Sequence, residues 1–329
     1  MFTWIRDTIG GVVAGPEWDL KSIGDLTDKV AVVTGVSCGG IGYEVAKALV
    51  RNNAHVYLAC RDESRAVAAM SSIERELATA QASTSQFTRV GKMSFLHFDL
   101  LDIQACTAAA STLIFELTRL DLVVANAGVA FWPWRLIEGV ELQFYNHLGH
   151  FAFVNPLIPL LELTAKSKPH GSTRIIVLTS NSHHQSPRPD FASIASVSQP
   201  YRTTLSRYAQ SKLCNLLFVN SLSRKIPPAV KVLGVHPGPV ASQIYSGSSA
   251  SWPFTRMFAK YIIPYFLLTP EEGAASVLFG LFAEEDLVGP SGGYIVPRAT
   301  LAKPSATALD ENLADELWSL SEHAVRVAT

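Results

Sequence analysis

The stretch that decides the fold is residues 30–42, which read VAVVTGVSCGGIG. The first half, residues 30–34, is a continuous apolar run, as expected for a strand that is buried on both faces. The second half is rich in glycine, and residues 43–51 then place apolar side chains at helical spacing. A strand, a glycine turn and a helix in this order predict a site where the backbone approaches a pyrophosphate and the helix N-terminus faces the anion.

The alternation of strands and helices continues along the chain. We expect further strands at residues 55–60, 94–98, 122–125, 174–178, 231–235 and 294–296. We expect helices at residues 63–80, 103–118, 139–163, 310–324, around Tyr208 and after the capping-box sequence that begins at Thr269. Such β-α-β units need right-handed crossovers, so the pattern predicts an α/β protein with a parallel doubly wound sheet. We expect a single domain at residues 29–329, preceded by an N-terminal extension at residues 1–28.

Composition narrows the class of protein. The formal net charge of -1 lacks the basic excess of a nucleic-acid binder. The apolar fraction of 48% with 17% charged residues indicates a large core, an apolar substrate site or a membrane-facing patch. The four cysteines show no paired spacing, which favours free thiols and a cytoplasmic location. No apolar run reaches the roughly 20 residues of a membrane span, although the sequence leaves peripheral membrane contact open.

Three charged residues bear on the cofactor. Arg61 ends the second predicted strand, 19 residues after Gly42, where the ribose of a bound dinucleotide would lie. An acidic residue there suits the 2′-hydroxyl of NAD, whereas an arginine suits the 2′-phosphate of NADP. Asp62 follows directly, so NAD stays the less favoured alternative. Asp99 could accept from the adenine amino group or act as a helix N-cap.

A tyrosine and a lysine share one helix face further along. Tyr208 and Lys212 are four residues apart, in the sequence RYAQSK. A cation about 4 Å from a phenol favours the phenolate by roughly 4 kcal/mol at an effective dielectric of about 20. The pair therefore predicts a general acid/base, and Ser180, at the end of a strand, could donate to a substrate carbonyl. The neighbouring His183 and His184 lack a third ligand at metal-binding spacing, so we predict solvated loop histidines and no metal site.

Together these motifs resemble the short-chain dehydrogenase/reductase family, over about residues 28–324. Within it the chain is similar to the retinol dehydrogenase and WW-domain oxidoreductase-like branch. The shared sequences are TG…GIG at 34–42, ACRD at 59–62, HFDL at 97–100, NAG at 126–128, YNHLGHF at 145–151, VLTS at 177–180, YAQSK at 208–212 and HPG at 236–238.

The resemblance implies a Rossmann domain, a nicotinamide cofactor and a catalytic tetrad. Tyr208 would be the general acid in carbonyl reduction and the base in alcohol oxidation. Lys212 would lower the phenol pKa and hold the ribose, Ser180 would polarise the substrate oxygen, and Asn146 would anchor a proton-supplying water chain. The cofactor-binding residues would be Gly35, Ser37, Gly40, Ile41, Gly42, Arg61, Asp99, Leu100, Asn126, Gly128, Tyr208, Lys212, Pro237, Gly238, Val240 and Ser242.

The chain departs from the family pattern in its glycine turn. One extra residue separates Gly35 from Gly40, which leaves open whether Ser37, Cys38 or Gly39 faces the phosphates.

The expected function is an NADP-dependent interconversion of a carbonyl and an alcohol. Aromatic residues in 245–266 suggest a lid over a bulky apolar substrate of terpenoid, polyketide, steroid or retinoid type, as in secondary metabolism; alternatively they pack the core or a dimer interface. A non-catalytic nucleotide-binding scaffold, or a lyase or epimerase on the same fold, is the alternative function. The sequence leaves a homodimer or tetramer open.

Overall fold

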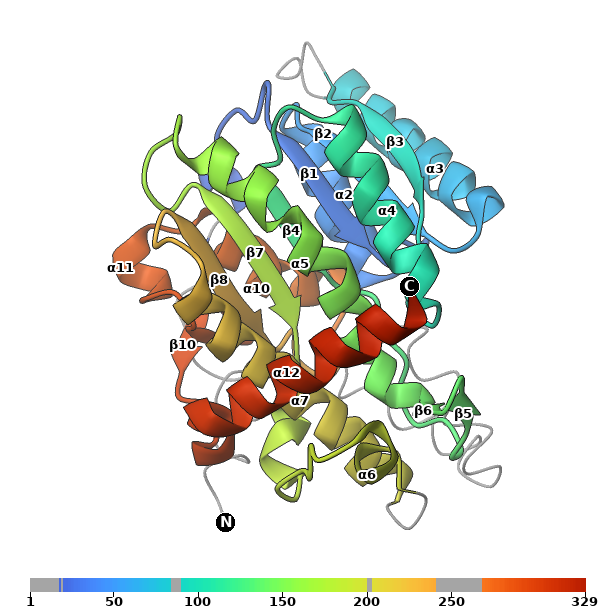
Figure 1. Cartoon of the computed structure of the whole chain (residues 1–329). Coiled ribbons are helices and arrows are strands. Elements are labelled where there is room, and N and C mark those ends of the chain that lie inside the picture. The colour runs from blue at the N-terminus through green and yellow to red at the C-terminus, as the bar shows by residue number, and fades with distance from the viewer. Residues whose placement is uncertain (1–17, 19, 84–89, 200–202, 241–267) are drawn as a thin grey trace.

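Eight strands form one sheet in the order β10-β9-β8-β7-β4-β1-β2-β3 (Figure 1). The computed structural model describes Trp18 and residues 20–83, 90–199, 203–240 and 268–329. The strands are β1 (Val30–Thr34), β2 (His55–Cys60), β3 (Met93–His97), β4 (Leu122–Ala125), β7 (Thr173–Leu178), β8 (Val230–Val235), β9 (Tyr294–Val296) and β10 (Thr300–Ala302). Neighbouring strands are parallel except β9 and β10, which are antiparallel. This confirms the predicted α/β class, with an antiparallel edge strand that the sequence reading missed.

Helices cover both faces of this sheet. One face carries α2 (Ile41–Arg51), α3 (Glu63–Ser83) and α10 (Pro270–Phe282). The other carries α4 (Ile103–Glu116), α5 (Tyr145–Ala165), α7 (Thr204–Lys225) and α12 (Glu311–Ala328). The other described helical elements are the short helices α6 (Ile194–Val197) and α11 (Glu285–Val288) and the 3₁₀ turns η1 (Leu20–Ser22), η2 (Leu142–Phe144), η3 (Asn181–Gln185) and η7 (Ala306–Leu309).

The burial of β1 shows why its residues form a central strand. Val30 and Val32 belong to the core under α5 and α7, and Ala31 and Val33 belong to the core under α2 and α10. Successive side chains of a strand point to opposite faces, so both faces must be apolar. Because β1 pairs with β2 on one side and β4 on the other, the strand order reverses between β1 and β4. Ligands of such sheets bind beyond the carboxyl ends of the strands at this place.

The predicted helix at residues 139–163 begins too early. A hairpin of β5 (Leu136–Ile137) and β6 (Val140–Glu141) and the turn η2 come first, and α5 starts at Tyr145. Leu142 and Phe144 are buried in this turn, so their apolar spacing imitated a helix without belonging to one.

Helix α5 lies in the core. Within the described ranges, the segment Leu142–Ala165, which comprises η2 and α5, is the one helical segment that is long and apolar enough to cross a membrane. It packs between α4 and α7, and 61% of its apolar window is buried in the protein, as in a core helix. Helix α12 crosses over α5 and α7 (Figure 1), where the Trp318 ring lies 5.0 Å from the Phe151 ring centre.

The capping box predicted at Thr269 is confirmed. The Thr269 N–H donates to Glu272 Oε2 (2.7 Å), and the Glu272 N–H donates to Thr269 Oγ1 (3.2 Å). Two of the first backbone donors of this segment are thereby satisfied.

Candidate active site

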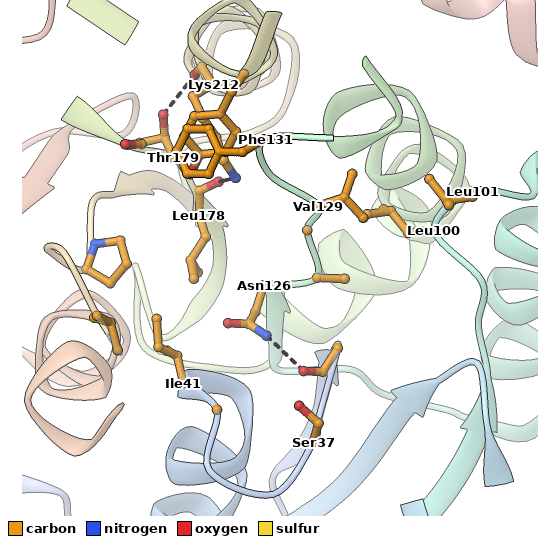
Figure 2. A pocket seen from close by; sticks show the side chains of 18 of the residues that line it. Ser37, Ile41, Leu100, Leu101, Asn126, Val129, Phe131, Leu178, Thr179 and Lys212 are labelled. Atoms are coloured by element: carbon orange, nitrogen blue, oxygen red, sulfur yellow. Dashed lines mark hydrogen bonds between the residues drawn. The ribbon is translucent and has the colours of Figure 1, made fainter. Parts of the chain in front are cut away.

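A cavity of about 910 Å³ opens at the carboxyl ends of the parallel strands. Its walls include residues 35–37, 60–62, 126–129, 178–182 and 236–240, which directly follow or end β1, β2, β4, β7 and β8. Figure 2 shows Ser37 and Ile41 across the cavity from Leu178, Thr179 and Lys212. Of the expected cofactor residues, Gly42 lies just behind this wall, and Ser242 lies outside the described residues. The aromatic stretch 245–266, which was expected to cover the substrate, also lies outside them.

The extra residue of the glycine turn is absorbed in a tight turn. The Gly40 N–H donates to Ser37 O (3.0 Å), and Gly39 has a φ of 71°. That left-handed conformation suits glycine. Cys38 is exposed, whereas Ser37 and Gly40 line the cavity. Ser37 is therefore the one of the three candidate residues that forms the wall.

Close packing brings the start of α2 to this wall. A Cβ on Gly42 would lie 2.6 Å from Asn126 Nδ2, and that amide donates to Thr34 O (2.7 Å). A Cβ on Gly35 would lie 2.7 Å from Ala127 Cα. No side chain caps α2 at Gly40, so its first N–H groups are left for a ligand. A helix N-terminus of this kind suits a phosphate.

Two arginines line the end of the cavity beside β2. Arg61 and Arg65 are exposed wall residues, and Arg65 was not foreseen. Asp62 is engaged as a cap of α3: its Oδ1 accepts from Ser64 Oγ (2.7 Å) and Ser64 N (2.9 Å). The Ser64 hydroxyl, with further backbone donors, lowers the pKa of Asp62. The Asp62 carboxylate, because of which the sequence analysis retained NAD as an alternative cofactor, thus has a structural role.

Asp99, which follows the third strand, does not cap a helix, which was one of the two roles expected for it. Asp99 lines the cavity and accepts from Leu101 N (3.0 Å), while Asp102 is the N-cap of α4. The reading of Asp99 as the helix cap was wrong, because the strand is followed by a short turn before the helix begins. Leu100 also lines the cavity. Its carbonyl oxygen packs against Gly149 of α5, and a Cβ on Gly149 would lie 2.4 Å from that oxygen.

Tyr208, Lys212 and Ser180 line one side of the cavity. The Lys212 Nζ lies 5.7 Å from the Tyr208 ring centre and donates to Leu178 O (3.2 Å). Burial lowers the pKa of Lys212 to about 8. Ser180 Oγ accepts from Ser182 N (3.2 Å), which leaves the Ser180 hydroxyl proton for an acceptor.

Asn146 holds the neighbouring wall from α5. Its Oδ1 accepts from Val129 N (2.8 Å), and its Nδ2 donates to Val129 O (2.8 Å) and Ser211 Oγ (3.0 Å). The Ser211 hydroxyl in turn donates to Tyr208 O (2.8 Å). The side chain of Asn146 therefore connects α5 to α7 and to the segment that follows β4.

A buried histidine extends this network to the glycine turn. His150 Nδ1 lies 2.9 Å from Asn146 O, which can only accept, so Nδ1 carries the proton. His150 Nε2 then accepts from the Thr34 hydroxyl (3.0 Å), whose oxygen accepts from Asn126 N (2.9 Å). Burial lowers the pKa of His150 to about 4, which keeps the ring neutral. Sequence reasoning missed His150, although its spacing of four from Asn146 on one helix was visible.

The two adjacent histidines are not both solvated. His183 is buried, with Nδ1 bonded to Ser180 O (2.9 Å) and Nε2 accepting from Ser305 N (3.1 Å). The prediction of a solvated histidine was wrong for His183, because residues near the C-terminus fold over it. His184 is partly buried. The described residues contain no cluster of histidine, cysteine and carboxylate side chains that could hold a metal.

His236 is a further wall residue without an assigned role in the sequence. Gly238 N donates to His236 Nδ1 (3.3 Å), which puts the proton of the neutral ring on Nε2. Burial, with smaller effects from Lys212 and His184, lowers the pKa of His236 to about 3. The ring therefore stays neutral beside Lys212.

Comparison with known proteins finds similar sequences over most of the chain. Residues 29–251 match the family described as short chain dehydrogenase. The chain is 34% identical over 312 residues to the WW domain-containing oxidoreductase of Homo sapiens, covering 92% of this chain and 69% of that protein. It is 32% identical over 316 residues to retinol dehydrogenase 14 of Mus musculus, covering 92% and 88%.

Solved structures share the fold. A protein from Mycobacterium paratuberculosis has a TM-score of 0.68 at 22% identity, covering 94% of this chain and 98% of that one. A short chain dehydrogenase of Shigella flexneri complexed with NADP has a TM-score of 0.57 at 21% identity, covering 83% and 99%. The matched family spans more than half of the chain, and the relatives extend the match over nearly all of it. The chain belongs to the short-chain dehydrogenase/reductase family, in the branch of the retinol dehydrogenases and WW domain-containing oxidoreductases.

Proposed function

We propose that this oxidoreductase interconverts a carbonyl and an alcohol on a bulky apolar substrate with NADP as its cofactor. The observation that carries the proposal is the shared cavity. Tyr208, Lys212 and Ser180 line it together with Ser37 and Gly40 of the glycine turn. A proton donor, a buried cation and a phosphate cradle at one sheet edge suit a reaction that moves a proton beside a bound dinucleotide.

The residues present fit a nicotinamide dinucleotide. The uncapped start of α2, with Ser37 and Ile41, would hold the pyrophosphate, and Arg61 with Arg65 would hold the 2′-phosphate of NADP. Asp99 and Leu100 would flank the adenine, with Asn126 and Gly128 beside its ribose, and Pro237, Gly238 and Val240 would lie on the nicotinamide side. When bound, the nicotinamide supplies hydride transfer to or from the substrate carbon.

The chain's own residues would handle the proton. Tyr208 would donate its phenol proton to the forming alkoxide in reduction and accept it in oxidation. Ser180, with its hydroxyl proton free to donate, would polarise the same oxygen. Lys212 would bring positive charge to the phenol and donate to ribose hydroxyls. The water chain expected at Asn146 would share its main-chain oxygen with His150.

An apolar wall supports the substrate type. Phe131, Trp132, Ile137 and Leu142 line the cavity from the segment that follows β4 and from the β5–β6 hairpin and η2. This wall is independent of the aromatic residues 245–266 on which the sequence argument depended. The relative named retinol dehydrogenase is consistent with an apolar alcohol or carbonyl substrate for this chain.

A cofactor assay across a panel of carbonyl compounds tests the proposal against its rivals. We expect oxidation of NADPH with apolar ketones or aldehydes of about ten carbons or more, and weaker activity with NADH. Tight NADPH binding without turnover of any compound would contradict the proposal and favour a nucleotide-binding scaffold. Conversion of a substrate with no net change in NADPH would favour a lyase or epimerase.

A further inference from the structure

Phe131 has a backbone conformation that a side chain of its size rarely adopts. It has a φ of 59°, in the left-handed region that favours glycine. Its N–H donates to Gln143 Oε1 (2.8 Å), and the Gln143 side chain is completely buried. Strained residues persist only where the surrounding structure holds them, and they cluster at functional sites.

A second set of buried polar groups fixes the same segment to α7. Gln143 Nε2 donates to Thr204 O (3.2 Å), at the first residue of the helix. Arg207 donates to Trp132 O (3.3 Å) and to Glu141 Oε1 (3.1 Å), and both members of this ion pair are buried. Removing one partner of a buried ion pair leaves an uncompensated charge, so breaking this connection is costly.

The result of these contacts is a ring placed against the candidate catalytic tyrosine. The Phe131 and Tyr208 ring centres are 4.9 Å apart, with 45° between the planes. Both residues line the cavity, and Figure 2 shows the Phe131 side chain among the lining residues. Arg207 directly precedes Tyr208, so the groups that fix the Phe131 segment and the tyrosine lie on the same turn of α7.

We propose that Phe131 is a specificity-determining residue of the reaction, a proposal that rests on the function proposed above. Its ring fills the space beside Tyr208 and excludes carbon skeletons that branch next to the reacting carbonyl. The substrate class is therefore an apolar carbonyl compound or alcohol that is unbranched next to the reacting carbon, with its bulk further away. One extra or missing methylene group in an apolar pocket changes relative rates by about 10- to 200-fold.

Two ketones of ten carbons test this assignment. 2-Decanone is unbranched, and the bicyclic 1-decalone branches at the ring-fusion carbon next to its carbonyl. For Phe131→Ala and Phe131→Gly we expect the kcat/KM ratio of 1-decalone to 2-decanone to rise at least tenfold, with the Kd for NADPH changed less than threefold. Glycine accepts the positive φ, so the second variant removes the ring without strain. Phe115→Ala is the matched control, because Phe115 on α4 is 92% exposed.

The outcomes separate this inference from the proposed function. A ratio within threefold of the unsubstituted protein, alongside an inactive Tyr208→Phe variant, would overturn the role of Phe131 alone. Retained turnover of 2-decanone in Tyr208→Phe would overturn the proposed function instead. Failure of the unsubstituted protein to reduce 2-decanone would contradict the substrate class.

A double-variant comparison tests whether Gln143 acts through Phe131. We expect Gln143→Leu to raise the same ratio, because it removes the acceptor for the Phe131 N–H. Phe131→Gly combined with Gln143→Leu should have the ratio of Phe131→Gly alone, since coupled residues are not additive. If Gln143→Leu lowers stability without changing the ratio of the two kcat/KM values, the positioning role of Gln143 is contradicted. It is also contradicted if the effects of Phe131→Gly and Gln143→Leu on this ratio multiply in the double variant.

Discussion

The Lys212 ammonium lies 5.7 Å from the centre of the Tyr208 ring, one helical turn away on α7. The lysine is 3% exposed, and its burial lowers its pKa to about 8. The sequence argument assumed a full charge about 4 Å from the phenol, in the partly solvated surroundings that an effective dielectric of about 20 describes. The structure replaces this with a buried lysine whose pKa is lowered to about 8.

The first prediction concerns the cost of burying this charge. The folded-state pKa of Lys212, about 8, is below the ordinary 10.5, so the unfolded chain binds more protons between these values. The free energy of unfolding should therefore rise by about 3 kcal/mol between pH 8 and pH 10.5, at about 1.4 kcal/mol per pKa unit. Urea unfolding of Lys212→Met without cofactor should lack this rise, whereas Lys166→Met, at an exposed position, should retain it. An identical pH dependence in Lys212→Met and the unsubstituted protein would contradict the account.

The second prediction concerns the choice of cofactor. Arg61→Asp should lower kcat/KM for NADPH by about 10- to 100-fold, the size of one charged hydrogen bond, and should shift preference toward NADH. Arg65→Ser should act in the same direction, because Arg65 lines the same end of the cavity. The control is Arg75→Ser, an exposed arginine further along α3. An unchanged ratio of NADPH to NADH activity in Arg61→Asp would contradict the assignment of NADP.

The third prediction concerns acid stability. Burial lowers the pKa of His147 to about 3, and its Nε2 pairs with Ser321 Oγ (2.7 Å). The unfolded chain therefore binds an extra proton below pH 6.5, and stability falls as the pH drops toward 3. The measurement is the free energy of unfolding in urea at pH 7, 6 and 5. In His147→Leu the slope of this free energy against pH should be smaller by the contribution of one proton, about 1.4 kcal/mol per pH unit. His323→Leu, at an exposed position on α12, should not change this slope. Equal slopes for both variants would count against a neutral buried histidine.

The sequence predicted the central strands well because burial on both faces leaves a local signal. The expected bounds of β1, β2, β4 and β9 agree with the structure, and the strand-end residues meet at one sheet edge as parallel topology requires. Only the start of the helix expected from residue 139 was wrong, because the hairpin and η2 bury apolar residues at spacings that also fit a helix.

Partners distant in sequence limited the prediction of the site. The burial of His183 depends on Ser305, and that of His147 on Ser321, neither of which a local pattern reveals. The positive φ of Phe131 depends on Gln143, and the sequence around it carries no glycine signal at that position. The capping role of Asp62 was likewise not predicted from the sequence, and its contact with Ser64 is what reveals it.

Replacement of the phenol tests the central claim most directly. Tyr208→Phe removes one hydroxyl and keeps the ring that packs against Phe131. We expect NADPH-dependent turnover to fall by about 10²- to 10⁴-fold, the usual contribution of a general acid, with the Kd for NADPH within a few-fold of the unsubstituted protein. Turnover by Tyr208→Phe equal to that of the unsubstituted protein would show that Tyr208 is not the proton donor.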